Sequence, residues 1–138
     1  MKVIVDTCVW SLSLRRRSAV QTSAQERHTL ALLREAIRDD RATIVGPIRQ
    51  EVLSGIRDPG QFAKIEGLLA PFLDEEILPR DYVEAARLFN LCQNHGVQCG
   101  AVDILICAVA VRLCYGVLTV DAGLTRCLAV LQGEMLLP

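Results

Sequence analysis

The amino-acid sequence predicts an α/β fold in which helices cover both faces of a parallel β-sheet. Short β-branched runs suited to buried strands occur at residues 3–5, 42–46 and 116–120. Stretches with hydrophobic residues at helical spacing separate these runs. Strands that alternate with helices in this way form parallel sheets.

The first long helix has a clear start signal. Ser23 and Glu26 have the spacing of a capping box, and Leu30, Leu33 and Ile37 follow at helical spacing. A shorter helix is expected earlier, around residues 9–14. We therefore expect two helices between the first two strands.

Two more helices are predicted after the second strand. Pro47 suits the first turn of a helix that Gly55 can end, and Asp58 begins a further helix that runs to about Leu69. A weak third strand is predicted at residues 75–78.

The second half of the chain continues the alternation. A helix over about residues 81–95 is expected to bury the face that carries Tyr82, Ala86, Phe89 and Cys92. Residues 101–115 are apolar nearly all round, which indicates a helix inside the protein. The predicted elements end with the strand at 116–120, a short helix at 122–128 and a possible fifth strand at 134–137.

Composition favours a globular protein of one domain, residues 1–138. The chain has 138 residues and a net charge of −1, and 51% of the residues are hydrophobic. Lys2 leads directly into the first strand, without the longer apolar region of a signal peptide. The longest apolar stretch, residues 104–111, is far too short to span a bilayer. We expect a cytoplasmic protein with no membrane association.

The six cysteines form no C-x-x-C pair. Neither His28 nor His95 completes the spacing of a zinc site. Most of the cysteines lie in apolar helical stretches, where cysteine behaves as a small hydrophobic residue. We therefore expect packing residues rather than a zinc site or a disulfide.

Two strands end on an aspartate. Asp6 follows the first strand beside Thr7, and Asp121 follows the strand at 116–120, near Thr119. Ligands of open parallel sheets bind outside the carboxyl ends of the strands. Each aspartate taken alone could instead cap a helix.

Two further acids lie in predicted helices. Asp103 is in the first turn of the most apolar helix, and the one basic residue of that helix, Arg112, is more than two turns away. Burial of an unpaired carboxylate costs several kcal/mol, so Asp103 needs a cation. Glu51 has inward-facing neighbours, although it could also be a solvated residue paired with Arg49 or Arg57.

If these four acids meet at one end of the sheet, they form an all-oxygen site. Such a site selects hard cations, Mg²⁺ or Mn²⁺. These ions commonly act on phosphates by polarising an oxygen and activating a bound water. The pattern therefore predicts a metal-dependent reaction on phosphate groups.

Four motifs carry a family resemblance when they are read in order. They are VDTCVW, PIRQEVLSGIRD, CGAVDILICAVAV and LTVDAGL. In this order and spacing they resemble the PIN-domain nucleases, and specifically the VapC toxins of bacterial type II toxin–antitoxin pairs. The resemblance covers nearly the whole chain.

The resemblance implies a three-layer fold with a parallel sheet in the order 3-2-1-4-5. It assigns metal binding and catalysis to Asp6, Glu51, Asp103 and Asp121, and supporting hydroxyl roles to Thr7 and Thr119. The sequence departs from the family at two positions. Cys8 stands where relatives often have Ser or Asn, and Gly123 stands where many have a further acid.

The family also implies a substrate and partners. These are an RNA that the enzyme cleaves with Mg²⁺ or Mn²⁺, a cognate antitoxin protein that blocks the acidic groove, and a second copy of the chain in a homodimer. With a net charge of −1, RNA contacts must come from local basic patches. Arg15, Arg16 and Arg17 are the candidates, although a basic run is commonly a solvated loop.

Three other functions agree less well with these residues than a nuclease does. A response-regulator receiver needs a late lysine, but the chain has only Lys2 and Lys64. A haloacid-dehalogenase-type phosphatase needs a second acid two residues after Asp6, where Cys8 stands. The remaining alternative is a PIN fold that binds RNA or a partner without cleaving, and the presence of all four acids argues against it.

Overall fold

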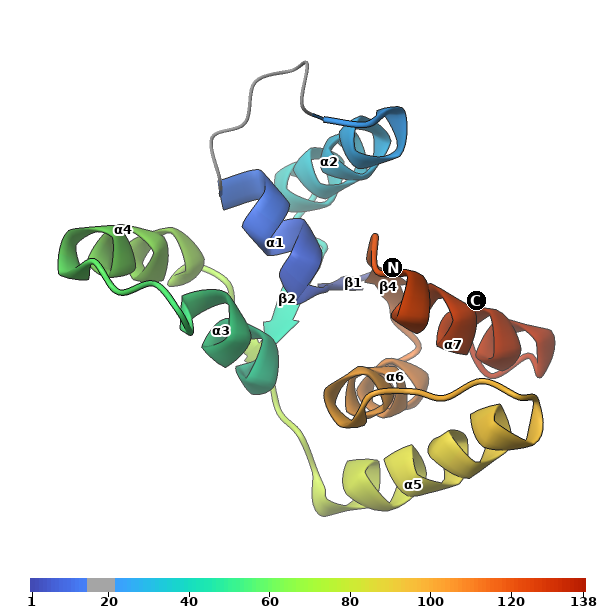
Figure 1. Ribbon diagram of the computed structural model, residues 1–138. Coiled ribbons are helices and arrows are strands. Elements are labelled where there is room, and N and C mark those ends of the chain that lie inside the picture. Colours follow the sequence, from blue (N-terminus) through green and yellow to red (C-terminus); the bar gives the residue numbers. More distant parts are fainter. Residues whose placement is uncertain (15–21) are drawn as a thin grey trace.

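The computed structural model describes residues 1–14 and 22–138. The strands are β1 (Val3–Val5), β2 (Ala42–Val45), β3 (Asp74–Glu75) and β4 (Gly116–Leu118). The helices are α1 (Thr7–Leu14), α2 (Ala24–Arg38), α3 (Gly46–Leu53), α4 (Pro59–Leu69), α5 (Pro79–Asn94), α6 (Ala101–Leu113) and α7 (Ala122–Gly133). Figure 1 shows how these elements are arranged.

The strands of the described chain form a parallel sheet in the order β3-β2-β1-β4. Val3 of β1 lies opposite Ala42 of β2 and Gly116 of β4. Crossovers between parallel strands are right-handed, so the reversal of direction after β3 puts the later helices on the other face. In Figure 1, α1 to α4 accordingly lie apart from α5 to α7. The predicted α/β class with a parallel sheet is confirmed.

The predicted fifth strand is wrong. Helix α7 continues to Gly133, five residues beyond the helix expected from the sequence, and Glu134 caps it. Met135 then adopts a left-handed conformation, and the amide of Leu136 donates to the carbonyl of Leu131. This tight turn folds the chain back onto the end of α7, and residues 134–138 form no strand. The predicted third strand is also displaced, because pairing with β2 involves residues 74–75 rather than 75–78.

The predicted start of α2 is confirmed. The hydroxyl of Ser23 accepts the amide of Glu26, and the carboxylate of Glu26 accepts the amide of Ser23. Leu33 is buried as expected, but Ile37 is 41% exposed and Ala36 faces the core instead. The buried face is thus rotated by about one residue from the predicted one.

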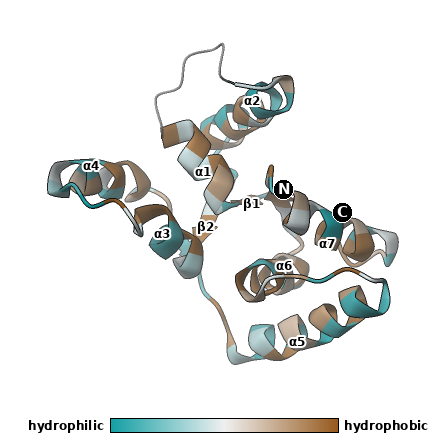
Figure 2. Ribbon diagram, in the orientation of Figure 1, coloured by the Kyte–Doolittle hydropathy of each residue, from teal (hydrophilic) through white to brown (hydrophobic). Residues whose placement is uncertain are grey.

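Helix α6 lies in the protein interior, as its apolar sequence indicates. Residues 106–110 are almost wholly buried, and α6 contacts β1, β4, α5 and α7. Figure 2 shows mainly hydrophobic residues on α1 and α6, whereas α2 and α5 have many hydrophilic residues along their length. In the part of the chain that the structure describes, no helix is long and apolar enough to cross a membrane.

The predicted buried face of α5 is correct at Cys92 and wrong at Tyr82. Tyr82 is 58% exposed, and the buried residues of this helix are Asp81, Ala85, Leu88 and Cys92. Asp81 turns inward because it forms an ion pair with Arg112 of α6, at 2.7 Å from Oδ1 to Nε. A charged pair cannot be recognised from hydrophobic periodicity, so the sequence pattern pointed to the neighbouring face.

The Asp81 carboxylate has several compensating contacts. Burial alone raises its pKa, but hydrogen bonds from Arg112 and from the amide of Leu78, together with the charge of Arg112, outweigh that effect and lower the pKa overall. Arg112 also donates to the carbonyl of Glu76. The pair therefore joins α5, α6 and the segment that follows β3.

We predict that Asp81→Ala lowers the free energy of unfolding by about 3–5 kcal/mol, because it leaves Arg112 without its partner in a partly buried position. Glu84→Ala is the control, since it removes the surface pair with Arg87 and should cost less than about 1 kcal/mol. Urea denaturation of both variants measures the difference. A loss below about 1 kcal/mol for Asp81→Ala would contradict the structural role of the pair.

Candidate metal centre

Asp6 lies at the carboxyl end of β1 and is 6% exposed. Its Oδ1 accepts the amide of Thr7 at 2.8 Å, and its Oδ2 accepts the hydroxyl of Thr119 at 2.8 Å and the thiol of Cys8 at 3.3 Å. These bonds come from both strand ends that border the reversal in strand order. They fix the carboxylate at the position where ligands of parallel sheets bind.

Asp121 follows β4 and is the N-cap of α7. Its Oδ2 accepts the amide of Leu124 at 2.8 Å, so the capping role that the sequence left open is present. The amide of Asp121 donates to the hydroxyl of Thr119, which in turn donates to Asp6. Thr119 thus connects two of the predicted acids, in agreement with a supporting role.

Glu51 reaches the same region from α3. Its Oε2 accepts the hydroxyl of Thr7 at 3.2 Å, which links it to the residue next to Asp6. The alternative pairing with Arg49 does not occur, because the guanidinium of Arg49 binds Asp74 and the carbonyls of the α4–β3 connection. Glu51 is exposed, as a ligand open to an incoming substrate would be.

Asp103 lies in the first turn of α6, and Gly100 precedes the helix as its N-cap. Burial raises the pKa of its carboxyl to about 6, and the charges of Asp6, Asp121 and Glu51 each add to the increase. All three other acids therefore lie within electrostatic reach of Asp103. The structure brings the four predicted acids together, and we call them the acid site.

The four carboxylates of the acid site form no ion pair with any Lys, Arg or His in residues 1–14 and 22–138, which the structure describes. In the same residues, no three carboxylates bring one oxygen each to within 4.8 Å of one another. Mg²⁺ commonly uses only one or two carboxylates and keeps several waters, so an ion bound here would need water for most of its coordination.

The two departures from the family pattern are both at the acid site. Burial and the charge of Asp6 raise the pKa of the Cys8 thiol, although hydrogen bonds from Thr119 and Val120 oppose the increase. The protonated thiol can donate to Asp6 as a serine hydroxyl would. At Gly123, a Cβ atom would lie 3.1 Å from Oδ2 of Asp121, so the present backbone leaves little room for a fifth acid.

Two other features lie near or outside the acid site. A pocket of about 240 Å³ is lined by Glu51 and by polar side chains that include Ser11, Ser54 and Gln61. This pocket was not predicted from the sequence, because residues of three separate helices, α1, α3 and α4, form its walls. The predicted RNA-binding residues 15–17 lie outside the described residues.

The prediction for the cysteines is wrong for one pair. Cys99 and Cys127 form a disulfide across 28 residues of sequence. Short sequence spacings could not reveal it, because the fold brings the start of α6 beside the middle of α7. Cys92 and Cys107 are buried free thiols, as expected for packing residues.

Comparison with known proteins gives no family for this chain. No protein-family model matches the sequence, and no curated protein matches it. The function therefore has to be argued from the geometry and charge of the acid site.

We predict that Asp103→Asn raises the melting temperature of the metal-free protein at pH 7 by a few degrees. The folded protein holds the Asp103 proton more tightly than the unfolded chain, because its pKa is raised from 3.8 to about 6. Ionisation of Asp103 therefore lowers the free energy of unfolding, and this loss grows as the pH rises from about 4 to about 6. The difference in melting temperature between variant and wild type should grow over the same interval.

Thermal melts in EDTA and in millimolar Mg²⁺ measure this effect. Mg²⁺ should stabilise wild type by mass action and the variant much less. Asp39→Asn is the control, because Asp39 follows α2 at the opposite end of the sheet and should show neither change. An equal Mg²⁺ stabilisation of wild type and Asp103→Asn would remove Asp103 from the metal centre.

Proposed function

We propose that this protein is a Mg²⁺- or Mn²⁺-dependent endoribonuclease of the PIN-domain type and the toxin of a type II toxin–antitoxin pair. The observation that carries the proposal is the acid site. Carboxylates from four separate elements converge at the reversal in strand order and form no ion pair with any Lys, Arg or His among the described residues. A concentration of negative charge without a cation is the expected state of a site that binds one.

The strand order supports the same family. The four strands of the described chain follow the order 3-2-1-4, which is the first part of the order that the PIN resemblance implies. That order places β1 and β4 side by side, and with them Asp6 and Asp121. The fold and the acids are thus consistent with one another.

Each residue of the acid site has a separate task in this proposal. Asp6 is held rigidly by three hydrogen bonds and is the fixed ligand. Glu51 and Asp121 are exposed and can adjust toward the ion and its waters. The ion, when bound, polarises a phosphate oxygen and lowers the pKa of a bound water. Thr7 and Thr119 orient the carboxylates that they contact.

The substrate would approach along the pocket beside Glu51. Hydroxyl and amide groups of Ser11, Ser54 and Gln61 line this pocket and can donate to phosphate or ribose oxygens. Since the chain has a net charge of −1, long-range attraction for RNA is weak. Binding then depends on such local contacts and on the metal.

The proposed antitoxin would act on the same acids. An arginine of the antitoxin can pair with a carboxylate through two parallel hydrogen bonds and supply the missing positive charge. It would compete with the metal and block the pocket. A homodimer of the toxin is part of the same proposal and rests on the family resemblance.

We predict that Asp6→Asn and Asp103→Asn each reduce RNA cleavage more than about a hundredfold. Residues that only orient metal ligands already contribute about 10–100-fold, and these two would be ligands themselves. The assay is cleavage of labelled RNA with Mg²⁺ or EDTA, and the products should have 5′-phosphate and 3′-hydroxyl ends. Asp39→Asn should retain full activity.

Cleavage that persists in EDTA, or in both variants, would contradict the proposal. A folded wild type that binds Mn²⁺ and RNA without cutting any RNA would favour the non-cleaving PIN module instead. Both outcomes are read from the same protein preparation.

A separate prediction concerns the basic run. If Arg15, Arg16 and Arg17 contact phosphates, their joint replacement by Ala weakens RNA binding and reduces the salt slope by about 0.7 per lost contact for single strands. Mn²⁺ affinity should not change, because the acid site is intact. An unchanged salt slope would show that the run is a solvated loop.

A further inference from the structure

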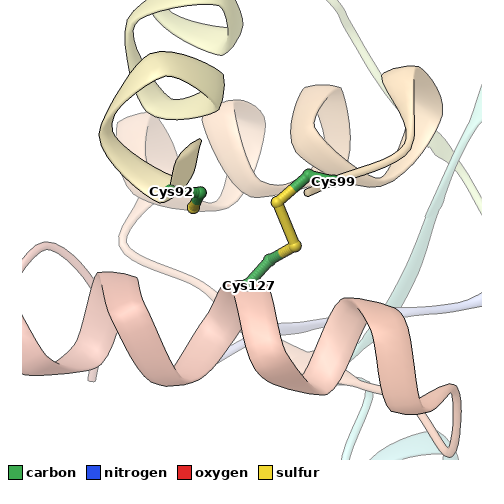
Figure 3. Close-up of side chains that lie close together, drawn as sticks. All are labelled: Cys92, Cys99 and Cys127. Atoms are coloured by element: carbon green, nitrogen blue, oxygen red, sulfur yellow. A yellow bond between two sulfur atoms is a disulfide. The ribbon is translucent and has the colours of Figure 1, made fainter. Parts of the chain in front are cut away.

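A second group of reactive side chains lies away from the acid site. The sulfur atoms of Cys92, Cys99 and Cys127 all lie within 4.8 Å of one another. Figure 3 shows them where the end of α5, the segment before α6 and the middle of α7 meet. Cys99 and Cys127 are joined by the disulfide, and Cys92 is a free thiol. We call these three residues the cysteine cluster.

The cluster suits thiol–disulfide exchange better than zinc binding. Structural zinc takes four ligands, whereas the cluster of the described chain has three, two of which are bonded to each other. The nearby His95 is engaged elsewhere, with Nε2 on Glu134 and Nδ1 near the carbonyl of Leu91. A disulfide with a third thiol in contact range is the arrangement from which exchange proceeds.

The position of the disulfide links it to the acid site. Cys99 comes four residues before Asp103, next to the N-cap of α6. Cys127 comes six residues after Asp121, the N-cap of α7. The disulfide is therefore a covalent connection between the segment that leads into α6, which has Asp103 in its first turn, and α7, which has Asp121 as its N-cap.

We propose that the cysteine cluster is a redox clasp that sets the distance between Asp103 and Asp121. In the disulfide form the starts of α6 and α7 are held together for metal binding. In the dithiol form α7 keeps its chain connection to β4 and its packing but loses its covalent link to the segment before α6. Repulsion between the two carboxylates then moves the starts of the two helices apart. The effect on the metal rests on the proposed function, whereas the clasp itself does not.

The reductant is a dithiol, and the exchange balances. One of its thiolates attacks Sγ of Cys99, which is 6% exposed whereas Cys127 is fully buried. The sulfur–sulfur bond breaks, and Cys127 leaves as a thiolate and takes up a proton. The second thiol of the reductant then displaces Cys99 as a thiol, and the reductant departs as a cyclic disulfide.

Cys92 gives the clasp an internal route as well. Attack of Cys92 on Sγ of Cys99 forms a Cys92–Cys99 disulfide and releases Cys127, with one proton passing from Cys92 to Cys127 and no net oxidation. That product joins α5 to the segment before α6 and leaves α7 free. Burial raises the pKa of the Cys92 thiol, which keeps the thiolate scarce and this exchange slow at neutral pH.

Thiol counting tests the clasp first. Denatured wild type should take four alkyl labels without reduction, on the free cysteines, and six after reduction. Peptide mapping should find Cys99 joined to Cys127. Six labels without prior reduction in protein purified under air would overturn the proposal.

Hydrogen exchange and Mn²⁺ titration test whether breaking the disulfide loosens the start of α7 and weakens metal binding. In EDTA, reduction or Cys127→Ala should lower the melting temperature by about 10 °C and accelerate exchange at the amide of Leu124, which Asp121 caps. Mn²⁺ affinity, measured after removal of the reductant under argon, should fall about tenfold, within the usual range for coupled sites. Cys114→Ala, at an exposed free cysteine, is the matched control and should change nothing.

The outcomes separate the two proposals. Unchanged exchange at Leu124 on reduction would overturn the clasp, whether or not Mn²⁺ binds. Faster exchange at Leu124 with an unchanged Mn²⁺ affinity would overturn the control of the acids by the clasp. It would not contradict the metal centre. Faster exchange with no Mn²⁺ binding in any form would support the clasp and contradict the proposed function.

Discussion

The buried carboxylate of Asp6 is the constraint on which the rest of the acid site depends. An ionised carboxylate removed from water needs hydrogen bonds to offset its lost hydration. Asp6 obtains them from Thr7 and Cys8 at the end of its own strand and from Thr119 after β4. Residues more than a hundred positions apart in sequence must therefore meet, which they do because β1 and β4 are neighbours in the sheet.

The other three acids lie around the Asp6 carboxylate and are more exposed to solvent than Asp6 is. Asp103 is partly buried, whereas Glu51 and Asp121 reach solvent. Burial, together with the charges of the other three acids, raises the pKa of Asp103 to about 6. Near neutral pH this carboxyl can be relieved either by a proton or by a cation. The fold thus maintains an unfavourable concentration of charge, which a purely structural role would not require.

Much of the fold could be predicted from sequence because its signals are local. The capping box at Ser23, the apolar helix at residues 101–115 and the aspartates at strand ends all depend on neighbouring residues. The proximity of Asp6 and Asp121 was predictable for the same reason, since parallel strands bring their carboxyl ends to one edge. The grouping of these two with Glu51 and Asp103, which lie in helices, was expected from the family resemblance.

The features that sequence analysis missed depend on contacts between distant segments. The ion pair of Asp81 with Arg112 joins α5 to α6 through residues 31 positions apart in sequence and shifts the buried face of α5 from the expected one to the neighbouring one. The disulfide of Cys99 with Cys127 likewise needs α7 to lie against the start of α6. The missing fifth strand reflects the length of α7, which no residue pattern after position 128 marked.

The backbone at Gly123 has a consequence for how the acid site can change through mutation. A side chain at this position would begin 3.1 Å from the carboxylate of Asp121. A single substitution to aspartate would therefore disturb an existing acid while adding a new one. The Asp121 carboxylate would have to move by a few tenths of an ångström to make room, and its bond from the amide of Leu124 would have to adjust with it. A fifth acid at this position would thus be gained at the expense of the cap that begins α7.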